Sequence, residues 1–315
     1  GARAILPSRC DLVREGRAMD TYPPKARELV SRLSQTAEAS PETTAAFQGA
    51  PGAYSHQAVR ELFPDFAPLP CVSFGAAIDA VSEGRARYAV IPIENSQHGR
   101  VADIHFLLPE SGLSITHEHF VRVSHCLLAR PGTRREEVRE AFSHAQALGQ
   151  CRRRLEAWDI KPRPTFDTAG AAALVAEETA PGRAAIASAL AAELYGLDIL
   201  ERGIEDAEHN TTRFVALSRK PASLPAEADV MTTLMFEVRS VPAALFKALG
   251  GFATNGVNLT KIESYLRDGV FQAAEFYIDI EGHPDQPEVA RAMDELGYFT
   301  KWVRVLGTYE RARAR

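Results

Sequence analysis

From residue 44 onward, short apolar runs alternate with longer stretches in which apolar residues recur every three or four positions. The short runs predict buried strands and the periodic stretches predict amphipathic helices. The expected strands are residues 45–48, 88–93, 121–129, 139–142, 163–166, 184–187 and 214–217. The expected helices are residues 54–63, 74–81, 144–158, 168–178 and 190–195. Strands that alternate with such helices are typical of an α/β sheet with mostly parallel strands.

This alternation stops at residues 221–230, where prolines and small residues predict a linker. The order of elements then restarts as a strand, a helix, a hairpin, a second helix and a last strand. The first strand is expected at 231–238 and the first helix at 242–254. The hairpin is expected at 258–266 and 270–280, with its turn at 267–269. The second helix is expected at 287–296 and the last strand at 299–306. The order βαββαβ is the ferredoxin-like arrangement. We therefore expect a large α/β domain at 44–220 and a small α+β domain at 231–311.

Residues 1–43 form an N-terminal extension that we expect to be partly helical. Within it, Ala26, Leu29, Val30 and Leu33 recur at helical spacing, which predicts a helix at 23–36. The first nine residues carry positive charge without a following apolar segment, so a secretory signal is not expected. No functional role is assigned to this extension.

Composition excludes several classes of protein. The net charge of −5 comes with no long Lys/Arg block, which disfavours nucleic-acid binding, and no apolar run reaches the length of a membrane span. The four cysteines include no CxxC pair, which argues against both a zinc site and a disulfide framework. We expect a cytoplasmic, soluble protein that uses no metal and no cofactor.

Polar residues gather where predicted strands end and helices begin. They are Asn95 and Ser96, then Ser143, His144 and Gln150, then Asp167 and Thr168, and finally Asn210, Thr211, Thr212 and Arg213. Each group alone is compatible with an ordinary helix cap, and we expect Ser55 and Ser143 to cap the helices at 54–63 and 144–158. Helix N-termini also suit carboxylates. In a doubly wound sheet these groups would converge on one crevice.

Together, these segments resemble prephenate dehydratase followed by a C-terminal ACT regulatory domain, over residues 46–309. The matching motifs are FQGAPGAYSH at 47–56, PIENS at 92–96, SH at 143–144, QC at 150–151, TA at 168–169, YGL at 195–197 and NTTRF at 210–214. The resemblance implies a catalytic unit of two α/β subdomains with an intervening cleft, like type II periplasmic binding proteins. It also implies crossover segments near 118–122 and 199–208.

The same resemblance assigns roles to residues. It implies that the catalytic residues are Thr212, Asn95, Ser96 and Gln150, and that the substrate-binding residues are Ser143, His144, Thr168, Arg213 and Ala53. Loss of a hydroxyl group from prephenate requires a hydrogen-bond donor, for which Thr212 is the candidate. The departing carboxylate is best held by neutral donors, because a tight ion pair would stabilise the ground state more than the transition state. Arg213 would then bind the carboxylate that stays.

The small domain departs from the family at its expected phenylalanine site. The motifs Gly-Ala-Leu-Val and Glu-Ser-Arg-Pro read Ala-Ala-Leu-Phe at 243–246 and Glu-Ser-Tyr-Leu at 263–266. The expected effector-binding residues are Ala243, Ala244, Leu245, Asn258, Leu259, Glu263 and Ser264. The resemblance also implies a homodimer or homotetramer formed through ACT domains.

The predicted function is decarboxylating dehydration of prephenate to phenylpyruvate, regulated by phenylalanine and without nucleic-acid or membrane partners. Arogenate dehydratase activity is a second possibility that these residues leave open. A third is a non-catalytic ligand-binding cleft coupled to an ACT sensor. Retention of Thr212, Arg213, Asn95 and Gln150 together favours an enzyme.

Overall fold

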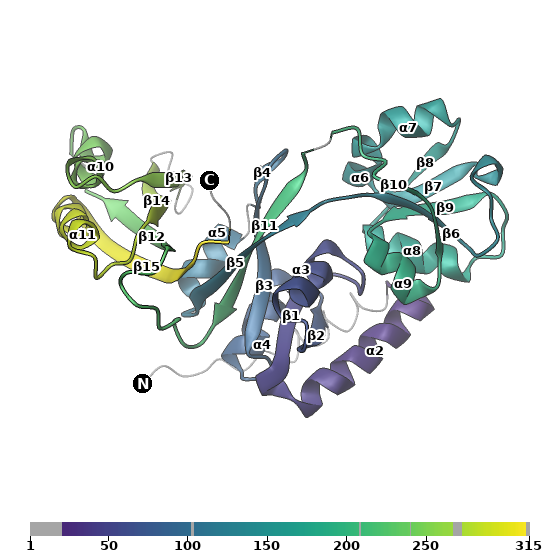
Figure 1. Ribbon diagram of the computed structural model, residues 1–315, viewed down its shortest axis with the longest axis horizontal. Helices are drawn as coiled ribbons and strands as arrows, with labels where there is room; N and C mark the ends of the chain where they lie inside the picture. The colour runs from purple at the N-terminus through teal and green to yellow at the C-terminus, as the bar shows by residue number, and fades with distance from the viewer. Residues whose placement is uncertain (1–20, 102–103, 208, 240, 267–272, 313–315) are drawn as a thin grey trace. The chain divides into compact units, whose positions relative to one another are not determined.

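The computed structural model describes residues 21–101, 104–207, 209–239, 241–266 and 273–312 (Figure 1). The chain divides into two compact units. The first consists of Gly1–Val101 and Phe120–Phe214, and the second of Ala102–His119 and Val215–Arg315. The second unit is therefore assembled from two stretches that are far apart in sequence.

The first sheet contains the strands β1 (Thr44–Gln48), β2 (Ala67–Cys71), β3 (Tyr88–Asn95), β5 (Ser114–Arg122) and β11 (Thr211–Ser218). Its order is β2-β1-β3-β11-β5, and the short strand β4 (Gly99–Arg100) pairs with β3. Strand β1 pairs in parallel with both β2 and β3. Helices α3 (Tyr54–Leu62) and α4 (Phe74–Ser82) connect these strands as expected. Strand β2 was not predicted, because Pro68 and Pro70 argue against a strand in the sequence. The structure places β2 at the edge of the sheet, where prolines are tolerated.

The second sheet contains the strands β6 (Cys126–Ala129), β7 (Glu140–His144), β8 (Lys161–Thr165), β9 (Arg183–Ala187) and β10 (Asp198–Arg202). Its order is β10-β6-β9-β7-β8. Strand β7 is parallel to β8 and β9, whereas β6 is antiparallel to both β9 and β10. The sheet is thus mixed rather than mostly parallel. The single strand expected at 121–129 is wrong, because the chain leaves β5 at Arg122 and enters the second sheet only at Cys126.

Helices α6 (Ala145–Gln150), α7 (Arg152–Ala157), α8 (Thr168–Glu177) and α9 (Ala189–Tyr195) accompany this sheet, and the short 3-10 helices are η1 (Pro41–Thr43) and η2 (Arg135–Glu137). The continuous helix expected at 144–158 is broken at Cys151. The segment after β10, which contains Asp206, accounts for the break because it bonds to the backbone on both sides of Cys151. The Asp206 amide donates to the carbonyl of Gln150 at 2.6 Å, and the Asp206 carboxylate accepts from the amide of Arg153.

The N-terminal helix α2 (Pro24–Ala39) packs against β2 of the first sheet and against α8 beside the second sheet. Figure 1 shows the helix running past both. Near its start, Leu29 packs in one buried cluster with residues of α8 and α9, and Tyr22 stacks on Phe166. At its other end, the Thr44 hydroxyl of β1 donates to the carbonyl of Ala37 at 3.1 Å. The expected helix is therefore confirmed, and it belongs to the core of this unit.

The loop before α3 lies against α9 at very short range. Ser188 Oγ donates to the carbonyl of Gly52 at 2.6 Å, and the Tyr195 hydroxyl donates to that of Pro51 at 2.8 Å. Gly52 has φ +95°, and a Cβ atom there would lie 2.9 Å from the Ala191 Cα, so glycine is required. The loop ends at Ala53, which is the N-cap of α3; the expected cap at Ser55 is wrong, since Ser55 is buried within the first turn.

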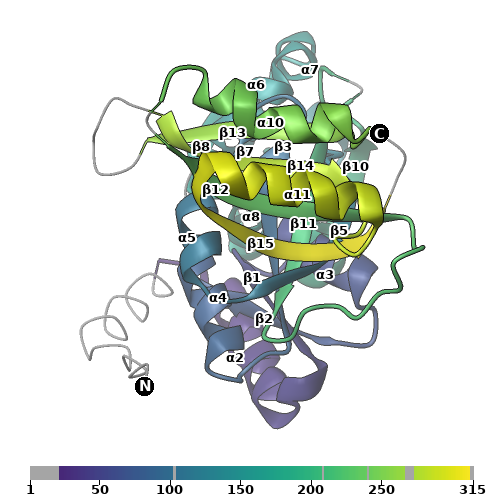
Figure 2. The ribbon, with the colours of Figure 1, turned by 90° about the vertical axis from the view of Figure 1, so that its left-hand side faces the viewer.

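The second unit has the ferredoxin-like order of elements. They are β12 (Val230–Val238), α10 (Ala244–Thr254), β13 (Leu259–Leu266), β14 (Ala273–Glu281), α11 (Pro287–Phe299) and β15 (Thr300–Glu310). The sheet order is β13-β14-β12-β15, with antiparallel pairs throughout, and both helices cover one face (Figure 2). The expected turn at 267–269 and the expected strand start at 270–272 lie outside the described residues.

Helix α5 (Ile104–Glu110) joins this second unit rather than the first. The Phe106 ring meets Tyr265 of β13 edge to face, and Arg304 of β15 donates to the carbonyl of Pro109. Between β11 and β12, residues 221–229 form neither a helix nor a strand. Within the described ranges, none of the helices has the length and apolar character that crossing a bilayer requires.

Candidate active site

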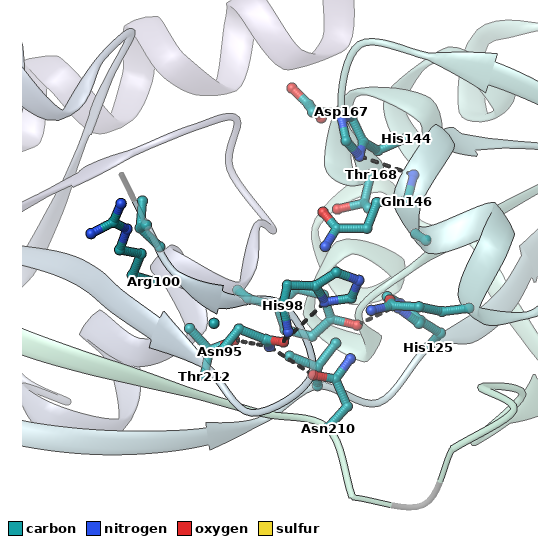
Figure 3. A pocket seen from close by; sticks show the side chains of 16 residues that line it. Asn95, His98, Arg100, His125, His144, Gln146, Asp167, Thr168, Asn210 and Thr212 are labelled. Atoms are coloured by element: carbon teal, nitrogen blue, oxygen red, sulfur yellow. Dashed lines mark hydrogen bonds between the residues drawn. The ribbon is translucent and has the colours of Figure 1, made fainter. Parts of the chain in front are cut away.

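A cavity of about 420 Å³ lies within the first unit, which is a size typical of small-molecule sites (Figure 3). The residues that line it are Tyr54, Asn95, His98, Gly99, Arg100, Val101, Val123, His125, His144, Gln146, Ala147, Gln150, Asp167, Thr168, Asn210 and Thr212. They come from both sheets and from six separated stretches of chain. Of the predicted site residues, the cavity brings together Asn95, His144, Gln150, Thr168 and Thr212.

Asn95 and Thr212 form the hydrogen-bonded centre of one wall. The Asn95 Nδ2 donates to the Thr212 hydroxyl at 3.0 Å and to Asn210 Oδ1 at 2.7 Å. Its Oδ1 accepts from the amides of Gln97 and His98, which fixes the turn after β3. The Thr212 hydroxyl has no acceptor for its own proton among the described residues. That proton is therefore available to a ligand in the cavity.

Ser96 lies beside this wall but does not line the cavity. Its hydroxyl donates to the carbonyl of His209 and accepts from the amide of Thr211, both at 3.0 Å. These bonds, together with one from the Ser96 amide to the Thr211 carbonyl, join the end of β3 to the start of β11. Ser96 therefore positions Thr212 rather than facing the ligand.

Ser143 is also absent from the cavity wall, and it does not cap α6. It is fully buried within β7, and its hydroxyl donates to the carbonyl of Ile186 at 2.6 Å. The strand continues two residues further than expected, to His144, so His144 becomes the N-cap, and its Nδ1 accepts from the Gln146 amide at 3.3 Å. Because neighbouring strand residues point to opposite faces, Ser143 turns into the protein while His144 reaches the cavity.

Arg213 faces away from the cavity for the same reason. Thr212 and Arg213 are neighbours in β11, so only one of them can point to the ligand. The guanidinium of Arg213 is 1% exposed and forms an ion pair with Glu94 at 3.1 Å. Ala53 likewise does not line the cavity and ends the loop before α3. Arg100 on β4 is instead the one Arg or Lys among the described lining residues.

Asp167 and Thr168, at the start of α8, line the end of the cavity that lies beside the second sheet. Asp167 is the N-cap of α8 and accepts from the amide of Gly170, while Thr168 is the first helical residue. Burial raises the pKa of the Asp167 carboxyl above its ordinary value.

Three lining residues form a chain of contacts that the sequence did not indicate. Tyr54 Oη lies 2.9 Å from His125 Nδ1, and His125 Nε2 lies 2.7 Å from Gln150 Oε1. Burial lowers the pKa of His125, which is 2% exposed, so its ring is neutral near pH 7. Tyr54 belongs to the motif at 47–56, but His125 lies inside a stretch expected to be plain strand. Its position before an apolar run offered no signal of a ligand site.

The predicted effector residues lie at the start of α10 and along β13 of the second unit. Ala243 has φ +59°, and Ala244, Leu245 and Leu259 contribute to one hydrophobic core. The carbonyl of Asn258 accepts from the amide of Glu281. The remaining two residues, Glu263 and Ser264, belong to β13, where Glu263 pairs with Lys261 at 3.1 Å.

Comparison with known proteins identifies the family. The model of the family described as prephenate dehydratase matches residues 45–222. A "bifunctional N-acyl-homoserine lactone acylase/prephenate dehydratase" of Komagataeibacter europaeus is 51% identical over 269 residues, which cover 85% of this chain and 96% of the relative. Arogenate dehydratase 3 of Arabidopsis thaliana is 37% identical, over 89% of this chain and 70% of the relative.

A solved structure agrees with these similarities. The prephenate dehydratase of Arthrobacter aurescens in complex with L-Phe is 33% identical, with a TM-score of 0.77 over 85% of this chain and 90% of that one. The matched range 45–222 contains every residue of the cavity wall. From its sequence, its fold and its cleft, this chain belongs to the prephenate dehydratase family.

Proposed function

We propose that this chain catalyses the decarboxylating dehydration of prephenate to phenylpyruvate, water and CO2. One observation carries the proposal: Asn95, Gln150, Thr168 and Thr212, from four separated stretches, line one cavity of small-molecule size. Their side chains are uncharged hydrogen-bonding groups, and the cavity wall adds a single guanidinium, from Arg100, and a single carboxyl group, from Asp167. This set suits a small dianion in which one carboxylate must leave and the other must stay.

The leaving hydroxyl group is the first chemical requirement. As the C–C bond to the departing carboxylate breaks, CO2 is released and the electron pair enters the ring. The ring then expels the hydroxyl group as hydroxide, which becomes water by taking a proton from solvent. The Thr212 hydroxyl accepts from Asn95 and keeps its own proton for the leaving oxygen. A threonine hydroxyl is too weak an acid to release that proton, so its role is a hydrogen bond that strengthens as charge develops.

The two carboxylates have opposite requirements. Neutral donors, with Gln150 and Thr168 as the candidates, can hold the departing carboxylate without stabilising its charge more than the dispersed charge of the transition state. The pyruvyl carboxylate keeps its charge and can be held by a cation. Since Arg213 is buried against Glu94 and does not line the cavity, we assign that role to Arg100 and not to Arg213.

The experiment measures the rate at which the purified protein forms phenylpyruvate from prephenate. The same protein is then assayed with arogenate, and the two kcat/KM values are compared. Turnover of prephenate with the higher kcat/KM supports the proposal. Higher kcat/KM for arogenate would make the chain an arogenate dehydratase, as several plant relatives are named. Absence of turnover of both, in a protein that is folded by circular dichroism, would leave a binding cleft without catalysis.

A second activity is favoured by one specific comparison. The relative at 51% identity is named as both an N-acyl-homoserine lactone acylase and a prephenate dehydratase. We therefore propose hydrolysis of an N-acyl-homoserine lactone as a second candidate function. Release of free homoserine lactone by the wild-type protein supports it. Loss of that release in Thr212→Val would place both activities in the same cavity, whereas unchanged release would place them apart.

The second unit supports a proposal about regulation. Its βαββαβ order and the Glu263–Ser264 pair favour an ACT-type domain that binds phenylalanine, the amino acid present in the Arthrobacter aurescens complex. Added phenylalanine is expected to raise the melting temperature and to lower turnover. If it changes neither, this assignment is wrong. We also propose a homodimer or homotetramer, to be measured by light scattering, and a cytoplasmic location, to be measured by cell fractionation.

A further inference from the structure

Gln150 presents two chemically different faces to its surroundings. Its Oε1 can only accept a hydrogen bond, and its Nε2 can only donate. Oε1 lies 2.7 Å from His125 Nε2, while no described residue accepts from the amide nitrogen. Gln150 lines the cavity, so the free donor is the part of the amide that is available to a ligand.

The contact with Gln150 determines the protonation of the histidine ring. A carboxamide oxygen can accept only if His125 Nε2 carries the proton, and burial keeps the ring neutral, so Nδ1 must be the unprotonated nitrogen. Nδ1 then faces the Tyr54 hydroxyl as an acceptor at 2.9 Å. That hydroxyl has one proton to share between Nδ1 and the carbonyl of Ser124, to which it also donates at 2.9 Å.

The histidine is itself held in place. Its backbone amide donates to Glu205 Oε2 at 2.8 Å, and its ring meets the Tyr54 ring edge to face with centroids 5.7 Å apart. The preceding Val123 amide donates to the carbonyl of Asn210, which anchors this crossover to the wall that contains Thr212. The ring therefore cannot turn to offer Gln150 its other nitrogen without losing the Tyr54 contact.

We propose that His125 is a positioning residue that fixes the orientation of the Gln150 amide, so that Gln150 offers the substrate a donor and never an acceptor. This inference rests on the proposed function, in which the ligand is a dianion. With the amide reversed, its oxygen would face a carboxylate and repel it. Because a terminal amide torsion is broad and roughly two-fold, packing alone does not select between the two orientations. The proton on His125 Nε2 selects the orientation in which the Gln150 oxygen faces the histidine.

The test compares His125→Phe with His125→Gln. Phenylalanine keeps the ring and its packing but offers no donor to Gln150 Oε1, and kcat/KM for prephenate is expected to fall about 10- to 100-fold because the amide is misplaced. Glutamine can place an amide N–H where Nε2 was, and it is expected to restore most of the loss. If His125→Gln is as inactive as His125→Phe while both remain folded, the proposed donor role is wrong.

A double variant separates positioning from packing. If His125 acts through Gln150, Gln150→Leu combined with His125→Phe is expected to be no less active than Gln150→Leu alone. A purely structural role would instead give losses that multiply. Multiplied losses would overturn the inference.

Nitrogen-15 NMR of histidine-labelled wild-type protein gives a reading that does not depend on turnover. The ring of His125, identified by its loss in His125→Gln, is expected to show the Nε2–H tautomer at pH 7. An Nδ1–H tautomer would overturn the inference even if prephenate is a good substrate. The expected tautomer in a protein that does not convert prephenate would contradict only the proposed function.

Discussion

The direction of each hydrogen bond decides what the Thr212 hydroxyl can do. Asn95 Nδ2 is a donor, so it uses a lone pair of the Thr212 oxygen and leaves the hydroxyl proton free. The same side chain uses its Oδ1 to hold the turn at Gln97 and His98. One asparagine thus shapes the wall and sets the polarity of the hydroxyl group.

Replacing Asn95 by aspartate is expected to reverse that polarity. An ionised carboxylate would accept the Thr212 proton, withdraw it from the substrate and add a negative charge beside a dianion. We expect kcat/KM for prephenate to fall about 100- to 1,000-fold. Gln97→Glu is the matched control, since it adds the same charge on the same exposed turn. Equal activity of the two variants would contradict this account.

His56 is expected to make stability depend on pH. Its ring is 2% exposed, stacks on Phe47 and accepts from the Gly52 amide, and burial, helped by nearby Arg60, lowers its pKa to about 4. Between pH 6.5 and pH 4 the unfolded chain therefore binds a proton there that the folded chain does not. Stability falls as pH falls through this window, by roughly 2 kcal/mol between pH 7 and pH 5.

Urea unfolding at pH 7 and pH 5 measures this effect. His56→Asn keeps an acceptor near Gly52 but cannot titrate in this range. The wild-type protein is expected to lose about 2 kcal/mol more than His56→Asn when the pH is lowered. Equal losses in the two proteins would show that His56 is not the group responsible.

At the residue scale, the sequence indicated groups by type but not the face on which each would lie. Asn95, Thr168 and Thr212 were predictable, because polar side chains at strand ends and helix starts tend to converge. Arg213 was misplaced because a one-residue step along β11 reverses the side-chain direction. Arg100 and His125 gave no such signal, since each reaches the cavity only through tertiary structure.

Helix α2 is the element whose importance the sequence understated. The sequence predicts the helix without a role for it, but its apolar face packs on α8 and α9, and Ala37 near its C-terminal end accepts a hydrogen bond from Thr44 of β1. Leu29→Ala is expected to lower the free energy of unfolding by about 2–5 kcal/mol. Exposed Arg32 on the same helix is the control, and Arg32→Ala is expected to change stability by less than about 0.5 kcal/mol. Chemical denaturation of both variants measures the difference.

Equal stabilities of the Leu29 and Arg32 variants would mean that α2 is dispensable for the first unit. The other elements were predictable where hydrophobic periodicity is strong, as in α3 and α11. Periodicity failed where a distant segment intervenes. Asp206 interrupts the helix at Cys151, and the passage between sheets divides the strand expected at 121–129.

At the scale of the whole molecule, the proposed active site and the proposed effector site lie in different units. The cavity and all of its described lining residues belong to the first unit, whereas the predicted effector residues belong to the second. The two units are joined by continuous strands, because β5 and β11 each contain residues of both. The βαββαβ order was predictable from spacing alone, but the recruitment of α5 to the second unit was not.

The most direct test of the central claim is the rate of phenylpyruvate formation from prephenate by Thr212→Val beside Thr212→Ser. Valine keeps the shape of threonine and removes the hydroxyl group, so kcat is expected to fall about 100- to 1,000-fold while the fold is kept. Serine keeps the hydroxyl group and is expected to stay within about tenfold of the wild-type rate. Wild-type turnover by Thr212→Val would contradict the account.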